Sequence, residues 1–442
     1  MDKNQLKASV HPIFLPDHPI RVMPSELKGT VTPPPSKSVA HRAMVCAALS
    51  GESDWPQLIQ GVEGPLSDDL RATFGGLLQL LDQTDDVTEI DGSTVIDCCE
   101  SGSTLRFLIP VALGLGKKCR FIGQGLLPER PLREFVDIFR DDPVILEFEN
   151  GDKSLPLTVQ GQLTGGEYKV PGHISSQYIT GLLLALPLTG EESTITLTSS
   201  LQSQPYVELT MDVMADFGVT VEWDQDRGPY GGYYLAGGQG YRRPAEPYFV
   251  EADFSQAAYW LTAAFIAHDL RIAGLNMHSR QGDRGVMTIL DRLHKIRDSH
   301  EGNLSVDMKD MPDLVPILAV AAATVPGAHV FRGCQRLRFK ESDRLAATME
   351  LLESIGVRSR YDEGADALTV YGIGLYEVLT GQPKGEPTVS CRGDHRMAMA
   401  QAIVGISSRH GVVIDEPSCV AKSWPEFFVE LVKLGGVFLE EN

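Results

Sequence analysis

Six segments of the chain share one pattern of polar and apolar positions. Each begins with one or more small polar or acidic residues and continues as a nearly uninterrupted apolar run, and successive starts lie about 60 to 80 residues apart. Ser and Asp are favoured N-caps, and a helix that is apolar around most of its circumference is buried inside a layer. The pattern therefore predicts six buried helices, in the segments 36–49, 101–115, 175–188, 253–267, 313–325 and 394–406.

The stretches between these runs carry the signals of strands and of surface helices. β-branched residues punctuated by Gly or Pro predict strands at 193–200, 234–240, 367–372 and 411–417. Apolar residues spaced i, i+3, i+4 and i+7 predict amphipathic helices at 132–140, 207–218 and 340–356. Each repeat then holds strands, one buried helix and one surface helix. This predicts an α/β (α+β) chain of two domains with three units each, and a crossing between them at 241–249. Other large α/β proteins also contain six buried helices, so this pattern alone does not indicate a function.

Composition places the chain among ordinary globular proteins and excludes several classes of partner. Of 442 residues, 43% are hydrophobic, and 59 Asp and Glu against 39 Lys and Arg give a net charge of −20. So acidic a chain is a poor binder of nucleic acid or of anionic membranes, and an anionic substrate would need positive charge concentrated at one site. No apolar run reaches the ~18 residues of a membrane span, and the N-terminus lacks an apolar signal region, so we expect a soluble protein. Seven cysteines without CxxC spacing favour a reduced, cytoplasmic chain.

Several cations stand where a helix does not favour them. The opening turns of three predicted buried helices contain Lys37 with Arg42, Arg106, and His395 with Arg396. The N-terminal end of a helix carries about +0.5 of an elementary charge, and a buried cation without a partner is costly. An anionic ligand in front of these helix starts would remove the conflict. The alternative is internal neutralisation by acidic neighbours such as Glu100, Asp253 or Asp394.

Further basic positions extend this idea. Arg130 adjoins a proline in a loop, where a phosphate clamp could lie, and Lys422 comes just before a predicted helix. Lys340 and Arg344 are four residues apart, which would put them on one face of the predicted helix at 340–356. The commoner interpretation of this segment, with Glu341 among its cations, is a solvated and salt-bridged helix face.

Familiar motifs of other enzyme classes do not occur. The chain has no GxxxxGK[ST], no GxGxxG after a strand, no HExxH and no GxSxG. This argues against an NTPase, a Rossmann dehydrogenase, a zinc protease of that type and an α/β-hydrolase. The 11 histidines show no metal-ligand spacing.

A series of longer motifs occurs in order along nearly the whole chain, from residue 35 to 427. They are PSKSVAHRA, SGSTLRF, LPERPL, PGHISSQYITGLLLALPL, SQPYVELT, VEADFSQAAY, PDLVPILAV, RFKESDRLA, GDHRMAMA and CVAKSWPEF. In combination they resemble the 5-enolpyruvylshikimate-3-phosphate synthase family (3-phosphoshikimate 1-carboxyvinyltransferase) of enolpyruvyl transferases. The resemblance implies a two-domain inside-out α/β barrel, with three βαβαββ units per domain and helix N-termini facing the interdomain cleft. It implies that residues 1–35 with 248–442 form the first domain and 36–247 the second.

The resemblance also implies a reaction. Family members transfer the enolpyruvyl group of phosphoenolpyruvate to the 5-hydroxyl of shikimate 3-phosphate by addition and elimination, and they release phosphate. The reaction belongs to the shikimate pathway, which leads to chorismate and the aromatic amino acids, and in this family glyphosate competes with phosphoenolpyruvate. No metal or organic cofactor is implied. We expect a cytoplasmic monomer whose partners are these two small molecules.

The family's motifs, carried over residue by residue, imply a site for each substrate. Shikimate 3-phosphate is expected to contact Lys37, Ser38, Arg42, Ser175, Ser176, Gln177, Ser203, Tyr206, Asp313 and Lys340. Phosphoenolpyruvate is expected to contact Lys37, Gly102, Arg130, Gln177, Arg344, Arg396 and Lys422. Asp313 is expected to take the 5-hydroxyl proton and Glu341 to protonate the methylene carbon, with Lys37 as a proton shuttle. Both substrates carry phosphate and carboxylate groups, which suits so many cations.

Two departures from the family pattern and two alternatives stand beside this assignment. Many relatives have Asn where this chain has Glu100, and we expect the same difference at Arg336, so both stay outside the predicted site.

One alternative is UDP-N-acetylglucosamine enolpyruvyl transferase, but that family has a reactive Cys before its Arg-Pro, and the segment 123–131 has none. The other is a non-catalytic phospho-ligand binder or ring-like scaffold. The joint presence of Lys37, Asp313, Glu341 and Lys422 argues against a catalytically inert chain.

Overall fold

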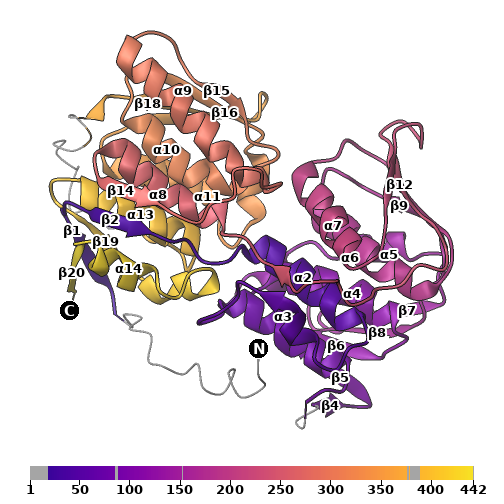
Figure 1. Cartoon of the computed structure of the whole chain (residues 1–442). Coiled ribbons are helices and arrows are strands. Elements are labelled where there is room, and N and C mark those ends of the chain that lie inside the picture. Colours follow the sequence, from indigo (N-terminus) through magenta and orange to yellow (C-terminus); the bar gives the residue numbers. More distant parts are fainter. Residues whose placement is uncertain (1–17, 85–87, 152, 376–377, 379–388, 442) are drawn as a thin grey trace. The chain divides into compact units, whose positions relative to one another are not determined.

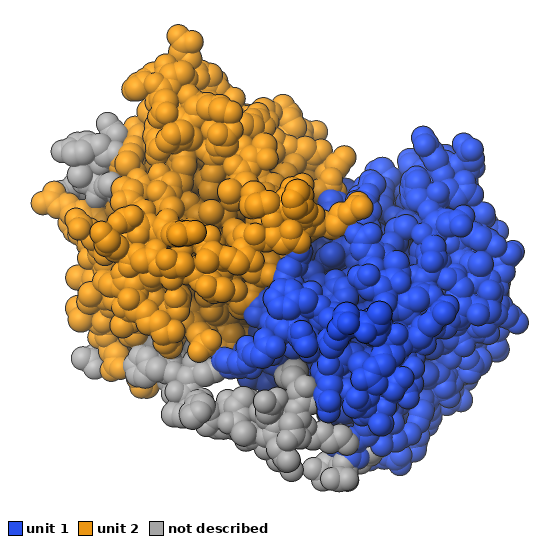
Figure 2. All heavy atoms as spheres, viewed as in Figure 1, with its two compact units in different colours: residues 1–9, 35–251 blue, residues 10–34, 252–442 orange. Residues whose placement is uncertain are grey.

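The structure, a computed structural model, describes residues 18–84, 88–151, 153–375, 378 and 389–441. The chain divides into two compact units, which Figure 2 shows in different colours. Of the described residues, unit 1 contains Pro35–Glu251, and unit 2 contains 18–34 with the residues from Ala252 onward. Each unit encloses its own buried apolar core. No helix in the described ranges is both long and apolar enough to cross a membrane.

Unit 1 is built around three helices that are buried along nearly their whole length. They are α2 (Lys37–Leu49), α4 (Gly102–Gly114) and α6 (Ser176–Ala185). Two partly exposed helices cover them: α3 (Asp68–Leu80) packs against α2 and α4, and α7 (Gln204–Asp216) against α2 and α6 (Figure 1). The shorter helical elements are α5 (Glu134–Ile138), η1 (Trp55–Leu58), η2 (Leu127–Glu129) and η3 (Leu186–Thr189).

The strands of unit 1 form mixed sheets. One has the order β4-β5-β6-β8-β7, with bounds Glu89–Ile90, Ser93–Asp97, Cys119–Ile122, Leu157–Gly161 and Val144–Phe148. A second has the order β11-β12-β10-β9, with bounds Glu222–Asp224, Gly232–Leu235, Ser193–Leu197 and Gly166–Val170. β5 and β6 run parallel, as do β9 and β10, whereas the other neighbours in these sheets are antiparallel. A short parallel pair joins β3 (Ile59–Gln60) to β13 (Tyr248–Phe249).

Unit 2 repeats the plan of three buried helices. They are α8 (Phe254–Ile266), α10 (Val315–Ala323) and α13 (His395–Ser407), and they pack against one another. Every residue of α10 is buried. The more exposed helices are α9 (Gly285–Ser299), α11 (Arg344–Ser354) and α14 (Phe427–Lys433). The 3₁₀ turns are η4 (Gly282–Arg284), η5 (Pro312–Leu314), η6 (Gln335–Phe339) and η7 (Pro417–Lys422).

The sheets of unit 2 join the two ends of the described chain. β1 (Ile20–Met23) lies between β19 (Val412–Ile414) and β20 (Val437–Glu440) and is antiparallel to both. β2 (Lys28–Val31) pairs in parallel with β14 (Asp269–Ile272). The remaining sheet has the order β15-β16-β18-β17, with bounds Ser305–Asp307, Gly327–Arg332, Ala367–Gly372 and Ser359–Asp362.

The predicted buried helices are all present, and the predicted α/β class is confirmed. The side chains of five predicted caps accept a backbone N–H of the first turn; they are Ser36, Ser101, Ser175, Asp253 and Asp394. The sixth cap is wrong, because Asp313 lies inside η5 and α10 begins only at Val315. The turn that starts at Pro312 begins the helix without a side-chain cap, which leaves the Asp313 carboxylate free for other contacts. The arrangement of three βαβαββ units per domain stays a prediction.

The predicted surface helices are present but shorter or shifted. The segment 207–218 lies largely in α7, and 132–140 contracts to α5. The helix predicted at 340–356 begins only at Arg344, because Asp343 caps it by accepting the Ala346 N–H at 3.0 Å. Lys340 follows η6 and is not helical. The prediction that Lys340 and Arg344 share one helix face is therefore wrong.

Candidate active site

At the start of α2, Lys37 pairs with an acidic residue that the sequence analysis missed. The Lys37 Nζ lies 2.6 Å from Oδ2 of Asp69, which belongs to the first turn of α3. Both side chains are largely buried. An acidic residue in the first turn of a helix is the ordinary arrangement, so nothing in the sequence marked Asp69 as part of a site.

Arg42, farther along α2, is a buried cation held by neutral groups. Its guanidinium donates to the Thr210 hydroxyl at 2.8 Å. It also donates to the carbonyl oxygens of Ser38 at 2.6 Å and Tyr206 at 2.8 Å, and it lies 5.3 Å from the Phe107 ring centroid. Arg42 is 4% exposed and forms no ion pair with a carboxylate of the described chain. Burial lowers the pKa of Arg42 to about 10, so the side chain stays charged at neutral pH.

The start of α4 brings Gly102, Arg106, Arg130 and Gln177 together. A Cβ atom on Gly102 would lie 2.9 Å from an Nη1 atom of both Arg106 and Arg130, so glycine leaves room for two guanidinium groups. Arg106 donates to Gln177 Oε1 at 3.0 Å and to the Pro131 carbonyl at 2.7 Å. Arg106 is only 3% exposed. The sequence marked Arg106 as a cation out of place, but the predicted site did not include it, and the structure puts it against residues that the site does include.

The remaining predicted residues of unit 1 lie at the starts of α6 and α7. Ser175 caps α6 by accepting the Gln177 N–H at 3.3 Å, and Ser176 is the first residue of that helix. Ser203 precedes α7 in a left-handed conformation with φ of 57°, and its carbonyl accepts the Tyr206 N–H at 3.1 Å. Arg42 donates to the Tyr206 carbonyl, and its Nη2 lies 3.4 Å from the hydroxyl of Thr180, one turn into α6. Ser38, Ser203 and Tyr206 therefore lie around Arg42, whereas Gln177 bonds to Arg106 and Ser103.

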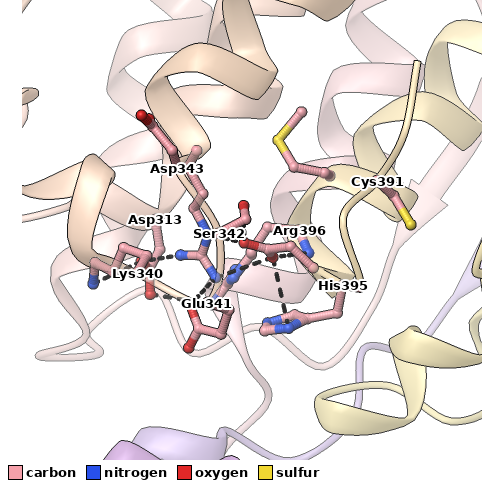
Figure 3. Close-up of polar contacts among 12 residues, drawn as sticks. Asp313, Lys340, Glu341, Ser342, Asp343, Cys391, His395 and Arg396 are labelled. Atoms are coloured by element: carbon pink, nitrogen blue, oxygen red, sulfur yellow. Dashed lines mark hydrogen bonds and ion pairs between the residues drawn. The ribbon is translucent and has the colours of Figure 1, made fainter. Parts of the chain in front are cut away.

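In unit 2, Arg344 connects carboxylates from three parts of the chain. Figure 3 shows Asp313, Glu341 and Arg396 turned toward one another. Arg344 Nε donates to Asp394 at 2.7 Å, Nη1 donates to Asp313 at 2.8 Å, and Nη2 donates to Glu341. Burial lowers the pKa of Arg344, but the carboxylates of Asp394, Glu341 and Asp313 outweigh burial and raise it well above its usual value. Arg344 is therefore a permanently charged centre with full internal compensation.

Asp313 is surrounded by three cations. Lys340 Nζ lies 3.1 Å and Arg344 Nη1 2.8 Å from its Oδ1, and Arg396 Nη2 lies 3.4 Å from its Oδ2. Burial alone would raise the pKa of Asp313, but Lys340, Arg396 and Arg344 hold it well below its usual range. The carboxylate is therefore ionised at neutral pH. Burial also lowers the pKa of Lys340.

Arg396 lies in the first turn of α13, and Lys422 contacts the residue before the cap of that helix. Asp394 caps that helix by accepting the Arg396 N–H at 2.9 Å, so one carboxylate serves both the cap and the Arg344 ion pair. The Nε and Nη1 atoms of Arg396 are buried and find no hydrogen-bond partner in the part of the chain that the structure describes. Lys422, the last residue of η7, donates to the Gly393 carbonyl at 2.8 Å.

Internal neutralisation, one of the two interpretations of the misplaced cations, is correct for Lys37 in unit 1, which pairs with Asp69. It is also correct for Arg344 and Arg396 in unit 2, which pair with Asp394 and Asp313. It is wrong for Arg42 and Arg106, whose partners are hydroxyl, amide and carbonyl groups. In the described ranges, no group of three or more His, Cys, Asp or Glu side chains could hold a metal ion.

The two residues left outside the predicted site lie in different units. Glu100 belongs to unit 1 and lies against Gly125, where an added Cβ would come within 2.5 Å of its Oε2. Arg336 lies in η6 of unit 2. Burial is the largest cause of the lowered pKa of Lys340, and the positive charge of Arg336 lowers this pKa further.

Comparisons with known proteins agree on one family. The family model of EPSP synthase (3-phosphoshikimate 1-carboxyvinyltransferase) matches residues 22–431. A 3-phosphoshikimate 1-carboxyvinyltransferase of Clostridium perfringens is 37% identical over 443 residues, covering 95% of this chain and 99% of the relative. One of Clostridium kluyveri is 37% identical over 438 residues, covering 94% and 97%. Among solved structures, EPSP synthase from Acinetobacter baumannii has a TM-score of 0.71 at 19% identity, covering 96% of this chain and 100% of that chain. The enolpyruvyl transferase NikO from Streptomyces tendae has a TM-score of 0.63 at 17% identity, covering 96% and 99%.

Proposed function

Because the chain belongs to the EPSP synthase (3-phosphoshikimate 1-carboxyvinyltransferase) family, we propose how the residues of its two units carry out the family's reaction. The chain is a transferase of the shikimate pathway, and it moves the enolpyruvyl group of phosphoenolpyruvate to shikimate 3-phosphate. We place the reacting side chains mainly in two clusters, one around Arg42 in unit 1 and one around Arg344 in unit 2.

Shikimate 3-phosphate binds mainly at the cluster around Arg42. Its contacts are Lys37, Ser38, Arg42, Ser175, Ser176, Gln177, Ser203 and Tyr206, joined by Asp313 and Lys340 of unit 2. The charge of the cluster supports this assignment, because the partners of Arg42 are neutral and its positive charge is not cancelled. The helix starts of α2, α6 and α7 add backbone N–H groups that favour an anion.

Phosphoenolpyruvate binds to cations of both units. Its contacts are Lys37, Gly102, Arg130, Gln177, Arg344, Arg396 and Lys422. Two observations support them. Gly102 leaves space beside two guanidinium groups, and Arg396 keeps two buried nitrogens without a partner in the described chain. Buried donors without acceptors are costly, so a ligand oxygen at these nitrogens would satisfy them.

The ionised Asp313 carboxylate among three cations is the observation that carries the catalytic assignment. Asp313 takes the proton of the 5-hydroxyl while the hydroxyl oxygen forms a bond to C2 of phosphoenolpyruvate, and Glu341 gives a proton to the C3 methylene. Elimination then breaks the bond between C2 and the phosphate oxygen. C3 returns a proton to the protein, which restores the double bond, and the phosphate leaves with the proton that Asp313 took from the hydroxyl.

The depressed pKa makes Asp313 a weak base before substrates bind. When substrate anions bind to Lys340, Arg344 and Arg396, they cancel part of the positive charge around Asp313. Its pKa then rises toward the range in which a carboxylate accepts a proton efficiently. Lys37 acts as the shuttle that returns a proton to Glu341.

Phosphate release from phosphoenolpyruvate tests the assignment directly. We expect release only when shikimate 3-phosphate is added, with one phosphate freed for each enolpyruvyl ether formed. A parallel reaction with UDP-N-acetylglucosamine should release none. Release that depends on the UDP-sugar, or no release with either acceptor, would overturn the assignment.

The finer organisation is also part of the proposal. We assign residues 1–35 with 248–442 to one domain and 36–247 to the other, and we expect a cytoplasmic monomer. The free thiols of all seven cysteines fit a reducing compartment. Size-exclusion chromatography with light scattering checks the oligomeric state, and a mass of twice the 48.3 kDa of one chain would contradict it.

A further inference from the structure

A row of buried hydrogen bonds joins three helices inside unit 1. His41 Nδ1 of α2 lies 2.7 Å from the Thr73 hydroxyl of α3, and that hydroxyl lies 2.6 Å from the Thr104 hydroxyl of α4. Thr104 then donates to the hydroxyl of Ser101, the cap of α4, at 2.7 Å. The four residues are between 0% and 1% exposed. The row is therefore fully internal.

The row has a single direction. The one hydroxyl proton of Thr104 goes to Ser101 or to the Asp69 carbonyl at 3.4 Å, so it is not available to Thr73. Thr73 must therefore donate to Thr104, and the Nδ1–H of His41 must donate to Thr73. Burial, then the charges of Lys37 and Arg42, hold the pKa of His41 well below its usual value. The imidazole is therefore neutral, and the direction of the row puts its one N–H at Nδ1.

The row lies beside residues assigned to phosphoenolpyruvate. His41, at one end, is one turn beyond Lys37 on α2, and Thr73 is one turn beyond Asp69, whose carboxylate binds Lys37. On α4, Ser101 and Thr104 flank Gly102, which lies against the guanidinium groups of Arg106 and Arg130. The row thus links the helix that carries Lys37 to the helix start that faces Arg130.

Apolar side chains at these core positions would pack in many relative positions of the three helices. A buried hydroxyl is costly unless it makes its hydrogen bond, so the row is satisfied in only a few relative positions of α2, α3 and α4. We propose that Thr73 and Thr104, together with His41, are positioning residues that hold the starts of α2 and α4 in the register that phosphoenolpyruvate requires. The inference rests on the proposed function, because it takes Lys37, Gly102 and Arg130 as contacts of that substrate.

Thr73→Val tests the inference, because it keeps the shape of the side chain and removes the hydroxyl in the middle of the row. We expect the KM for phosphoenolpyruvate to rise about tenfold, while kcat changes less. A tenfold rise corresponds to the free energy of one or two lost buried hydrogen bonds. Thr73→Ser keeps the hydroxyl and should restore the KM. The matched control is Thr262→Val in unit 2, which removes a buried hydroxyl that has no partner in the described chain and should leave the KM unchanged.

Several results would overturn the inference. If Thr73→Val loses only thermal stability, or lowers kcat with both KM values unchanged, the row is structural. If Thr73→Val does not fold, Thr104→Val breaks the same row and is measured in its place, and failure of both to fold also assigns the row to folding alone. Failure of the proposed function is distinguishable, because the unsubstituted protein would then release no phosphate with shikimate 3-phosphate.

Discussion

The clusters around Arg42 and Arg344 bury an arginine to nearly the same extent but compensate it in opposite ways. Arg42 in unit 1 is 4% exposed and bonds to hydroxyl and carbonyl groups. Arg344 in unit 2 is 1% exposed and bonds to three carboxylates. Burial lowers the pKa of Arg42 to about 10, whereas the carboxylates around Arg344 raise its pKa.

The difference separates two tasks. A buried cation with neutral partners keeps an electrostatic attraction for an anion, which suits the binding of a phosphorylated substrate. A cation bonded to carboxylates attracts an anion less, but it fixes those carboxylates in place and controls their protonation. In the proposed function, Arg42 of unit 1 attracts shikimate 3-phosphate, whereas Asp313 and Glu341 of unit 2 serve as base and acid.

The largest effect is expected from Glu341→Gln, which tests whether the carboxylates of unit 2 perform the chemistry. The amide keeps the shape of the side chain but supplies no proton to C3, so kcat should fall about 10²- to 10⁴-fold. Binding of shikimate 3-phosphate, measured by calorimetry, should change little. The control is Glu350→Gln, which removes a carboxylate from the exposed Arg392 ion pair and should leave kcat unchanged. Full activity of Glu341→Gln would refute the role.

A smaller effect, on stability, compares the two arginines directly. Arg344→Met removes the guanidinium to which Asp394, Glu341 and Asp313 bond and should cost about 3–5 kcal/mol of unfolding free energy. Arg42→Met leaves only neutral acceptors and should cost about 1–3 kcal/mol. Urea unfolding followed by tryptophan fluorescence measures both, since Trp55 is buried in unit 1 and Trp260 in unit 2. Equal losses would mean that the two forms of compensation do not differ in energy.

The smallest effect concerns acid stability. Because the pKa of Asp313 is held below its ordinary 3.8, its ionised form stabilises the folded state above that value, and the stabilisation is lost as the pH falls below it. The expected loss is about 1–3 kcal/mol between pH 5 and pH 2. Arg42 stays charged over this range in both states, so its cluster should add no such dependence. Asp313→Asn should flatten the profile of unfolding free energy against pH, and an unchanged slope would contradict the assignment.

Much of this architecture was predictable because its signals are local. Ser36, Ser101, Ser175, Asp253 and Asp394 cap their helices as the sequence indicated. A cap and the apolar run behind it lie within a few residues of each other, so neither depends on the rest of the fold. Asp313 resembled these caps in the sequence, but it lies inside the turn that starts at Pro312. Its carboxylate therefore pairs with Lys340, Arg344 and Arg396 and caps no helix.

The amino-acid sequence by itself determined where five of the six buried helices begin, which cations stand out of place at the helix starts, and which family the motifs resemble. Only the tertiary structure decided which of those cations are neutralised. Asp394 lies 50 residues from Arg344 and Asp313 lies 31, whereas Thr210 lies 168 residues from Arg42. The field at a buried charge depends on the groups within a few ångströms, and folding alone selects those groups from so far along the chain.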